Sequence, residues 1–172
     1  QVHDRGEFDG RLWISMDHVE GTDAAALLAQ RYPDGMPPEL VARIVSAVGD
    51  ALDYAHQRGL LHRDVKPANI LIADPQTDHE RIMLADFGIA YAIDCHAPFL
   101  DDASPSGTVE DALGTPVYMA PEQLRGLWRD YGPWTDLYAL GVLLWELACG
   151  LAPFRGPTPY EIGVQHISGA LP

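Results

Sequence analysis

One stretch of the chain constrains its fold more than any other. Between Pro38 and Gly59, apolar residues recur every three or four positions, which is the spacing of one face of a long helix. Pro37 and Pro38 open the stretch and Gly59 ends it, as is common at helix termini. The apolar positions are Leu40, Val41, Ile44, Val45, Val48, Leu52 and Ala55. A helix with such a face has to pack against another apolar element.

Residues 137–154 supply that element, since they are the most apolar part of the chain. Thr135 as N-cap and Gly150 as terminator predict a helix over residues 136–149. The segment carries Glu146 and is too short for a membrane span, which needs about 20 apolar residues. With 172 residues and 47% hydrophobic composition, the chain is expected to form one domain around these two helices.

Shorter apolar runs predict strands. Residues 11–16 alternate in character, and residues 70–72 and 82–84 are too brief for helices. Thr22 and Asp23 are alternative N-caps for a short helix that follows them. Residues 93–111 contain proline, glycine and acidic residues without any period, so they predict a loop. The expected class is therefore α+β and mainly helical.

Charge and cysteine content exclude several functions. The chain has 25 acidic and 11 basic residues, a net charge of −14 that repels nucleic acids and anionic membrane surfaces, so neither is an expected partner. Cys95 and Cys149 fit neither a disulfide framework nor a metal site, which favours a cytoplasmic location. One cysteine is expected to be buried in the apolar helix.

Three polar motifs border the short apolar runs. They are HRDVKPAN at residues 62–69, DFG at residues 86–88 and GTPVYMAPE at residues 114–122. Each short motif alone is also typical of a polar turn at the end of a buried strand. Three extended motifs in this order instead favour a single catalytic site.

The residue types in these motifs suit phosphoryl transfer to an alcohol. The carboxylate of Asp64 can accept a hydroxyl proton, and Lys66 can neutralise phosphoryl charge. Asn69 and Asp86 stand at the ends of two apolar runs, where they can meet across a strand pair. Their oxygen atoms are the ligands that Mg²⁺ prefers.

With these motifs the chain resembles a protein kinase. The resemblance implies that Asp64 orients and deprotonates the substrate hydroxyl and that Lys66 contacts the transferred phosphoryl group. It implies that Asn69 holds one Mg²⁺ (or Mn²⁺) ion and that Asp86 holds the ions that bridge the phosphates of ATP. The expected fold is protein-kinase-like, with a mainly helical C-terminal lobe.

The resemblance also assigns supporting roles. Glu122 anchors the end of the activation segment, and Thr115 precedes the substrate-binding loop. Asp136 corresponds to a buried aspartate that fixes the backbone of the HRD motif, in which His62 and Arg63 are structural.

Residues 12–21 resemble the last strands and the hinge of the ATP-binding lobe. The resemblance makes Met16 the gatekeeper, gives adenine hydrogen bonds to the backbones of Asp17 and Val19, and packs Leu71 beneath the adenine. The alternative is an edge strand followed by a turn. Residues 1–20 are thus expected to hold residual N-lobe strands and the hinge, and residues 21–172 a C-terminal lobe truncated before its final helices.

Parts of the family pattern are missing from this chain. Its only lysine, Lys66, already belongs to the catalytic loop, so the lysine of the N-lobe strand is missing. No glycine-rich loop precedes the hinge either. We therefore expect the chain alone to be inactive, although the kinase from which it comes would transfer phosphate to protein Ser and Thr residues and to itself.

The wording of the motifs indicates a bacterial Ser/Thr kinase. Lys66 two residues after Asp64 is typical of Ser/Thr kinases, and the VKPANI wording is similar to that of bacterial receptor-type kinases, which leaves room for a membrane anchor beyond Pro172. Small-molecule phosphotransferases are an alternative, but they lack the GTPVYMAPE segment. A pseudokinase or scaffold is another, but the four polar residues that pseudokinases typically lose are kept.

Regulation by phosphorylation is a further expectation. Arg63 directly before Asp64 is typical of kinases that need a charged activation loop. The candidate acceptors are Ser104, Ser106 and Thr108, of which Thr108 is preferred because it is nearest to the GTP sequence. Asp111 either supplies part of that charge already or is an ordinary solvated acid.

Overall fold

The structure is a computed structural model that describes residues 2–9, 11–75, 77, 79–87 and 116–169. The chain begins with a two-stranded antiparallel hairpin of β1 (Val2–Phe8) and β2 (Arg11–Met16). The alternating residues of β2 predicted that strand. Strand β1 was not predicted, because its sequence VHDRGEF is mostly polar and shows no alternation of apolar and polar residues. It pairs with β2 alone and needs no apolar face.

A second antiparallel sheet has the strand order β3-β4-β5. Its members are β3 (Gly21–Asp23), β4 (Ile70–Ala73) and β5 (Arg81–Leu84). Ile70 pairs with Leu84, and the backbone N–H of Ala85 donates to the carbonyl of Asn69 at 2.8 Å. The residues that precede β4 therefore lie beside those that follow β5, as the sequence predicted.

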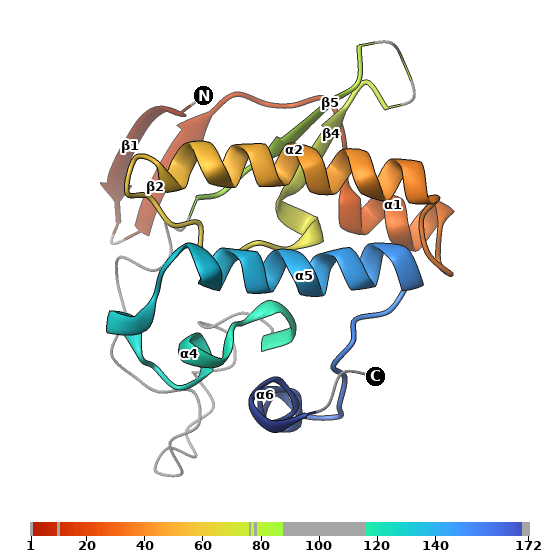
Figure 1. Cartoon of the computed structure of the whole chain (residues 1–172). Helices are drawn as coiled ribbons and strands as arrows, with labels where there is room; N and C mark the ends of the chain where they lie inside the picture. Colours follow the sequence, from red (N-terminus) through yellow and green to blue (C-terminus); the bar gives the residue numbers. More distant parts are fainter. Residues whose placement is uncertain (1, 10, 76, 78, 88–115, 170–172) are drawn as a thin grey trace.

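The longest helices are α2 (Pro38–His56) and α5 (Pro133–Cys149), which run antiparallel side by side (Figure 1). The predicted start of α5 was wrong. Its N-cap is Gly132, and the Thr135 hydroxyl inside the first turn accepts the Gly132 N–H at 3.1 Å. The helix begins three residues earlier than predicted because proline is favoured at the first helical position, which Pro133 occupies.

The remaining helices are shorter. Helix α1 (Ala24–Arg31) is capped by Asp23, whose carboxylate accepts the N–H of Ala26 at 2.8 Å, which decides between the two predicted caps. Helices α4 (Pro121–Leu124) and α6 (Pro159–Ser168) follow later in the chain. Single 3-10 turns are η1 (Pro67–Asn69), η3 (Pro116–Tyr118) and η4 (Trp128–Asp130).

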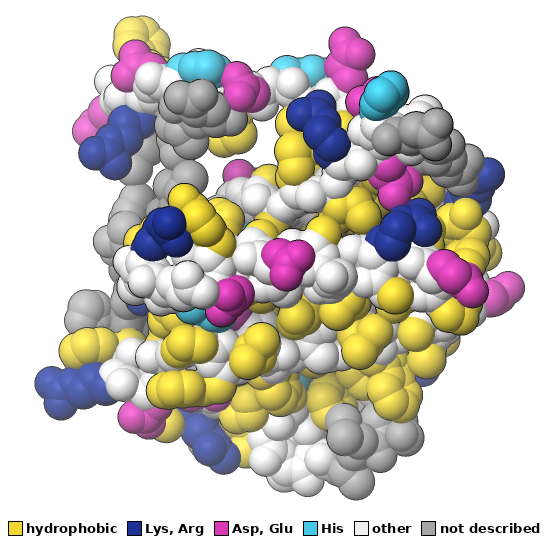
Figure 2. All heavy atoms as spheres, turned by 45° about the horizontal axis from the view of Figure 1, so that its top comes forward, with side chains coloured by type: hydrophobic (Ala, Val, Ile, Leu, Met, Phe, Trp, Pro, Cys, Tyr) yellow, Lys and Arg dark blue, Asp and Glu magenta, His cyan; other side chains and the backbone are white. Residues whose placement is uncertain are grey.

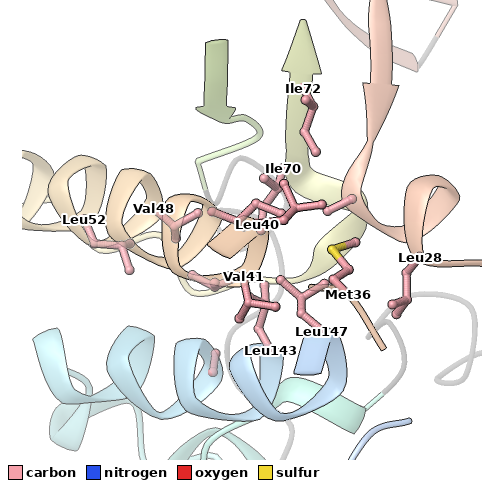
Figure 3. Close-up of a cluster of buried hydrophobic side chains, with 14 residues drawn as sticks. Leu28, Met36, Leu40, Val41, Val48, Leu52, Ile70, Ile72, Leu143 and Leu147 are labelled. Carbon is pink, nitrogen blue, oxygen red and sulfur yellow. The ribbon is translucent and has the colours of Figure 1, made fainter. Parts of the chain in front are cut away.

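The hydrophobic core lies between α2, α5 and the three-stranded sheet (Figure 3). Six of the seven predicted apolar positions of α2 are buried, and Val45 is half-buried. Ile44, Val48, Leu143 and Leu147 have no exposed surface at all. Burying each side chain of this size contributes about 1.5–3 kcal/mol, so the core fixes the two helices against each other.

Not all of α5 is covered. Hydrophobic side chains form a broad band across the lower half of the view in Figure 2. The large hydrophobic side chains that α5 exposes are Trp134, Leu137 and Leu144. Cys149 is exposed too, contrary to the prediction of a buried cysteine, because it lies on the last turn of α5. Among the described residues, no helix is long and apolar enough to span a membrane.

Candidate active site

The catalytic loop is fixed by a buried carboxylate from the central helix. Asp136 in the first turn of α5 is fully buried, and it accepts the backbone N–H groups of His62 at 2.9 Å and Arg63 at 2.6 Å. Arg63 has a left-handed backbone, with φ of 66°, which is unfavourable for a residue with a side chain. Hydrogen bonds to a charged acceptor are strong enough to offset that cost.

His62 connects the loop with the DFG motif. It is fully buried, its Nε2 lies 2.8 Å from the Ala85 carbonyl, and its ring centroid lies 4.7 Å from that of Phe87. Burial lowers the pKa of His62, against smaller raising effects of the Ala85 carbonyl and nearby carboxylates. The ring is thus neutral, with Nε2–H donating to Ala85 and Nδ1 accepting the N–H of Asp64 at 3.3 Å.

Asp64, Lys66 and Asn69 form one polar cluster. The carboxylate Oδ2 of Asp64 lies 2.8 Å from Nζ of Lys66. The side-chain amide of Asn69 donates to the same Oδ2 at 3.0 Å and to the backbone carbonyl of Asp64 at 2.8 Å. Asn69 is buried, whereas the side chain of Asp64 is 44% exposed, so its carboxylate is held from one side and open to a ligand on the other.

Asp86 follows β5 and is exposed, with a left-handed φ of 59°. Its charge raises the pKa of His62, which indicates that it lies close to the loop. Asp86 directly follows Ala85, whose backbone N–H donates to the carbonyl of Asn69 beside the pairing of β4 and β5. In the described part of the chain, no three His, Cys, Asp or Glu side chains cluster closely enough to hold a metal by themselves. One carboxylate and one amide instead fit an ion whose remaining ligands come from a phosphate or water.

Residues 118–123 form hydrogen bonds with α5 and with the HRD motif. The carboxylate of Glu122 accepts the Thr135 hydroxyl at 2.7 Å, and the Gln123 amide donates to the carbonyl of Arg63 at 2.9 Å. The Tyr118 hydroxyl donates to the carboxylate of Glu146 at 2.5 Å. Burial raises the pKa values of both Tyr118 and Glu146, which keeps the hydroxyl protonated as a donor.

The predicted hinge residues lie at the end of β2, in the segment that follows it, and in β4. Met16 ends β2 with 47% of its surface exposed, and the carboxylate of Asp17 lies 2.5 Å from Nε2 of His3. Val19 is half-buried, and Leu71 lies in β4 opposite Asp23. The predicted residues Ser104, Ser106, Thr108, Asp111 and Thr115 lie outside the described residues.

Two supporting residues had no assigned role in the sequence analysis. Nε2 of His56 lies 2.7 Å from Oδ2 of Asp136, and Gln123 holds the carbonyl of Arg63. His56 is the last residue of α2. Its position in the last turn of a helix, a few residues before the HRD motif, was the available signal.

Comparison with known proteins decides the family. Residues 2–170 match the family model described as the protein kinase domain. The chain belongs to the protein kinase family. Members of this family use ATP and a divalent metal ion, and their C-terminal lobe carries the three motifs in the order found in this kinase domain.

The matched relatives are bacterial. The domain is 51% identical over 171 residues to the serine/threonine-protein kinase PknF of Mycobacterium tuberculosis, which covers 99% of this chain and 34% of the relative. It is 44% identical over 153 residues to PknI of Mycobacterium bovis, covering 89% of this chain and 22% of that relative. The chain thus spans about a third or less of the length of these relatives.

A solved structure agrees with the fold. The crystal structure of a point mutant of the PknI kinase domain of Mycobacterium tuberculosis matches with a TM-score of 0.68 and 37% identity, covering 99% of this chain and 62% of that one. The predicted α+β, protein-kinase-like fold is therefore confirmed, as is the predicted resemblance to bacterial Ser/Thr kinases.

Proposed function

We propose that this chain forms the catalytic lobe and the hinge of a bacterial Ser/Thr protein kinase, which transfers the γ-phosphoryl group of ATP to Ser and Thr hydroxyls of proteins. The observation that carries the proposal is the cluster in which Lys66 and Asn69 hold one face of the Asp64 carboxylate. In this proposal residues 1–20 belong to the N-terminal lobe and hinge, and residues 21–172 to the C-terminal lobe.

Asp64 is the proposed catalytic base. Lys66 and Asn69 both contact Oδ2, which leaves Oδ1 to accept the proton of the substrate hydroxyl. The positive charge of Lys66 beside this carboxylate is placed to stabilise negative charge on the transferred group. Positioning and charge stabilisation supply most of the catalysis in phosphoryl transfer, so the rigid support from Asp136 bears directly on rate.

Asn69 and Asp86 would hold the Mg²⁺ or Mn²⁺ ions of bound ATP. The metal neutralises the developing charge on the phosphates when it is bound. The Asn69 amide nitrogen donates to Asp64, so its oxygen lies on the other side of the group, as a metal ligand requires. Met16, Asp17, Val19 and Leu71 are the proposed contacts of the adenine ring.

Regulation by the activation loop is part of this proposal. Among the described residues, the buried Nε of Arg63 has no hydrogen-bond partner. Its guanidinium lies 5.8 Å from the ring centroid of Tyr131. A phosphate on Ser104, Ser106 or Thr108 would add about −1.5 to −2 charge and could accept hydrogen bonds from the guanidinium of Arg63.

Phosphate transfer from labelled ATP tests the function. The complete kinase polypeptide that contains this chain should label a Ser- and Thr-containing protein in the presence of Mg²⁺, and Asp64→Asn should reduce the rate by at least about a hundredfold. Asp53→Asn, which changes an exposed carboxylate on α2, is the matched control and should keep full activity. Full activity of Asp64→Asn would refute the assignment of Asp64 as the catalytic base.

The chain alone, without the glycine-rich loop and the strand lysine, should transfer no phosphate under the same conditions. Robust labelling by the chain alone would contradict this part of the proposal. Transfer to a sugar or an aminoglycoside, without transfer to protein, would favour a small-molecule phosphotransferase instead.

A further inference from the structure

A buried histidine lies where α6 meets the turn η3. His166 belongs to α6 and only 6% of its surface is exposed. Helix α6 packs against η3, the first described turn of the GTPVYMAPE segment, and against α4, which ends that segment. An imidazole in such a position needs partners for both ring nitrogens, because an unpaired buried polar group is costly.

One nitrogen has a clear partner. Nδ1 of His166 lies 2.8 Å from the hydroxyl of Tyr138 on α5. Aromatic rings surround the imidazole, with centroids at 4.6 Å for Phe154 and 5.7 Å for Tyr138. The ring is thus fixed in orientation by α5 and by the chain that connects α5 with α6.

The other nitrogen, Nε2, lies near Val117 of the turn η3. Among the described residues, the buried Nε2 has no hydrogen bond of ordinary geometry. The backbone carbonyl of Val117 in η3 lies near enough to raise the pKa of His166, although burial outweighs it and lowers the pKa to about 4. The imidazole is therefore neutral near pH 7, and its single N–H is on either Nδ1 or Nε2.

Other charged groups around the ring do not change this assignment. Tyr138 on α5 has its pKa raised to about 12 by burial and by the charge of Glu122 on α4, so its hydroxyl stays protonated. Glu161, the acidic residue of the first turn of α6 itself, is exposed and accepts from Thr158 at the helix start. A protonated hydroxyl can donate to Nδ1, and the ring N–H then sits on Nε2.

We propose that His166 is a positioning residue for the protein substrate: it accepts the Tyr138 hydroxyl at Nδ1, directs its Nε2–H at the Val117 carbonyl, and so holds η3 in the form that receives the substrate peptide. Tyr118, the next residue of η3, is held by Glu146 of α5. Two adjacent residues of the turn are thus held by two different helices. This inference rests on the proposed function of the chain as part of a protein kinase.

The tautomer can be measured without activity. In the complete kinase with ¹⁵N-labelled histidines, the His166 signals are assigned by their loss in His166→Gln. We expect the neutral Nε2–H form at pH 7, with protonation only below about pH 5. Nδ1–H as the main form, or an imidazolium at pH 7, would overturn the proposed hydrogen bonds.

Kinetics test the positioning role. His166→Leu removes the hydrogen bond to Tyr138 and the N–H directed at Val117, and it should raise KM for a peptide substrate roughly fivefold or more, with KM for ATP unchanged within about twofold. His166→Gln, which keeps one donor and one acceptor, should restore most of the loss. His79→Leu, which changes an exposed histidine, is the matched control.

The outcomes separate the two proposals. A wild-type protein that shows the Nε2–H form but labels no protein would refute the proposed kinase function and leave the hydrogen-bond assignment supported. An active wild type whose His166→Leu variant keeps the same peptide KM would refute the positioning role alone. Equal rises in KM for peptide and ATP, not restored by His166→Gln, would show a general loss of structure and also refute it.

Discussion

Nε2 of His56 lies 2.7 Å from Oδ2 of Asp136, across the interface between α2 and α5. The same oxygen accepts the backbone N–H of His62 at 2.9 Å. One carboxylate therefore joins the end of one core helix, the start of another and the catalytic loop. The packing of the core and the shape of the loop depend on a single buried group.

Asp136→Ala should lower the free energy of unfolding by about 3–5 kcal/mol, because it leaves His56 and two loop N–H groups without their acceptor. Urea unfolding followed by circular dichroism measures the change. Arg43→Gln breaks an exposed ion pair with Glu80 and should change stability by less than about 1 kcal/mol. Equal effects of the two substitutions would contradict a central role for Asp136.

Two glycines, one inside α5 and one directly after it, should respond in opposite directions to substitution by alanine. Gly150 ends the helix with φ of 76°, and a Cβ there would lie 2.3 Å from the Pro33 carbonyl oxygen, so Gly150→Ala should cost about 2 kcal/mol or more. Gly141 lies inside the helix with nothing within 4 Å of its added Cβ, so Gly141→Ala should stabilise by about 0.5–1 kcal/mol. Thermal unfolding of both variants decides, and a stabilising Gly150→Ala would be inconsistent with this structure.

Stability should fall on mild acidification because of His166. Its pKa is about 4 in the folded state and near the ordinary value of 6.5 when unfolded, so between these pH values only the unfolded chain binds the proton. The free energy of unfolding should thus decrease by up to about 1.4 kcal/mol per pH unit from this group as pH drops from 6.5 to 4. Urea titrations at pH 7, 6 and 5 should show a shallower decrease for His166→Leu. Parallel pH profiles would mean that His166 is not protected from protonation.

Asn69→Ala should raise the Mg²⁺ concentration needed for half-maximal activity of the complete kinase, and it should also lower the rate, because the substitution removes a donor to Asp64. Asp86→Ala should abolish activity at any Mg²⁺ concentration. Initial rates over a Mg²⁺ series at fixed ATP provide the measurement. If Asn69→Ala lowers the rate without changing the Mg²⁺ dependence, the residue supports Asp64 only and does not hold the metal.

The sequence predicted the core helices and most of the site because local signals agree with the tertiary structure. The period of α2 predicted six positions that are buried, and the short apolar runs predicted β4 and β5. The pairing of these strands then placed Asn69 beside the residue that precedes Asp86. The proximity of Asn69 and Asp86 could therefore be predicted from the ends of the two strands alone.

Other features depend on partners far away in the chain, which no local pattern displays. The start of α5 was misplaced because Thr135, a good N-cap residue, uses its hydroxyl to bind Glu122 as well as the N–H of Gly132. Strand β1 is polar and exists only because it pairs with β2. His166 drew no attention because α6 itself was not predicted.

The hydrogen bond between His62 and Asp136 closes a loop of 74 residues. Because synthesis proceeds from the N-terminus, the HRD motif leaves the ribosome well before the helix that fixes it. At about 5–20 residues per second, several seconds separate the two events. In the nascent chain the catalytic loop acquires its shape only when α5 emerges and docks on α2, so a ribosome-bound intermediate that ends before Asp136 holds all the catalytic side chains without their arrangement.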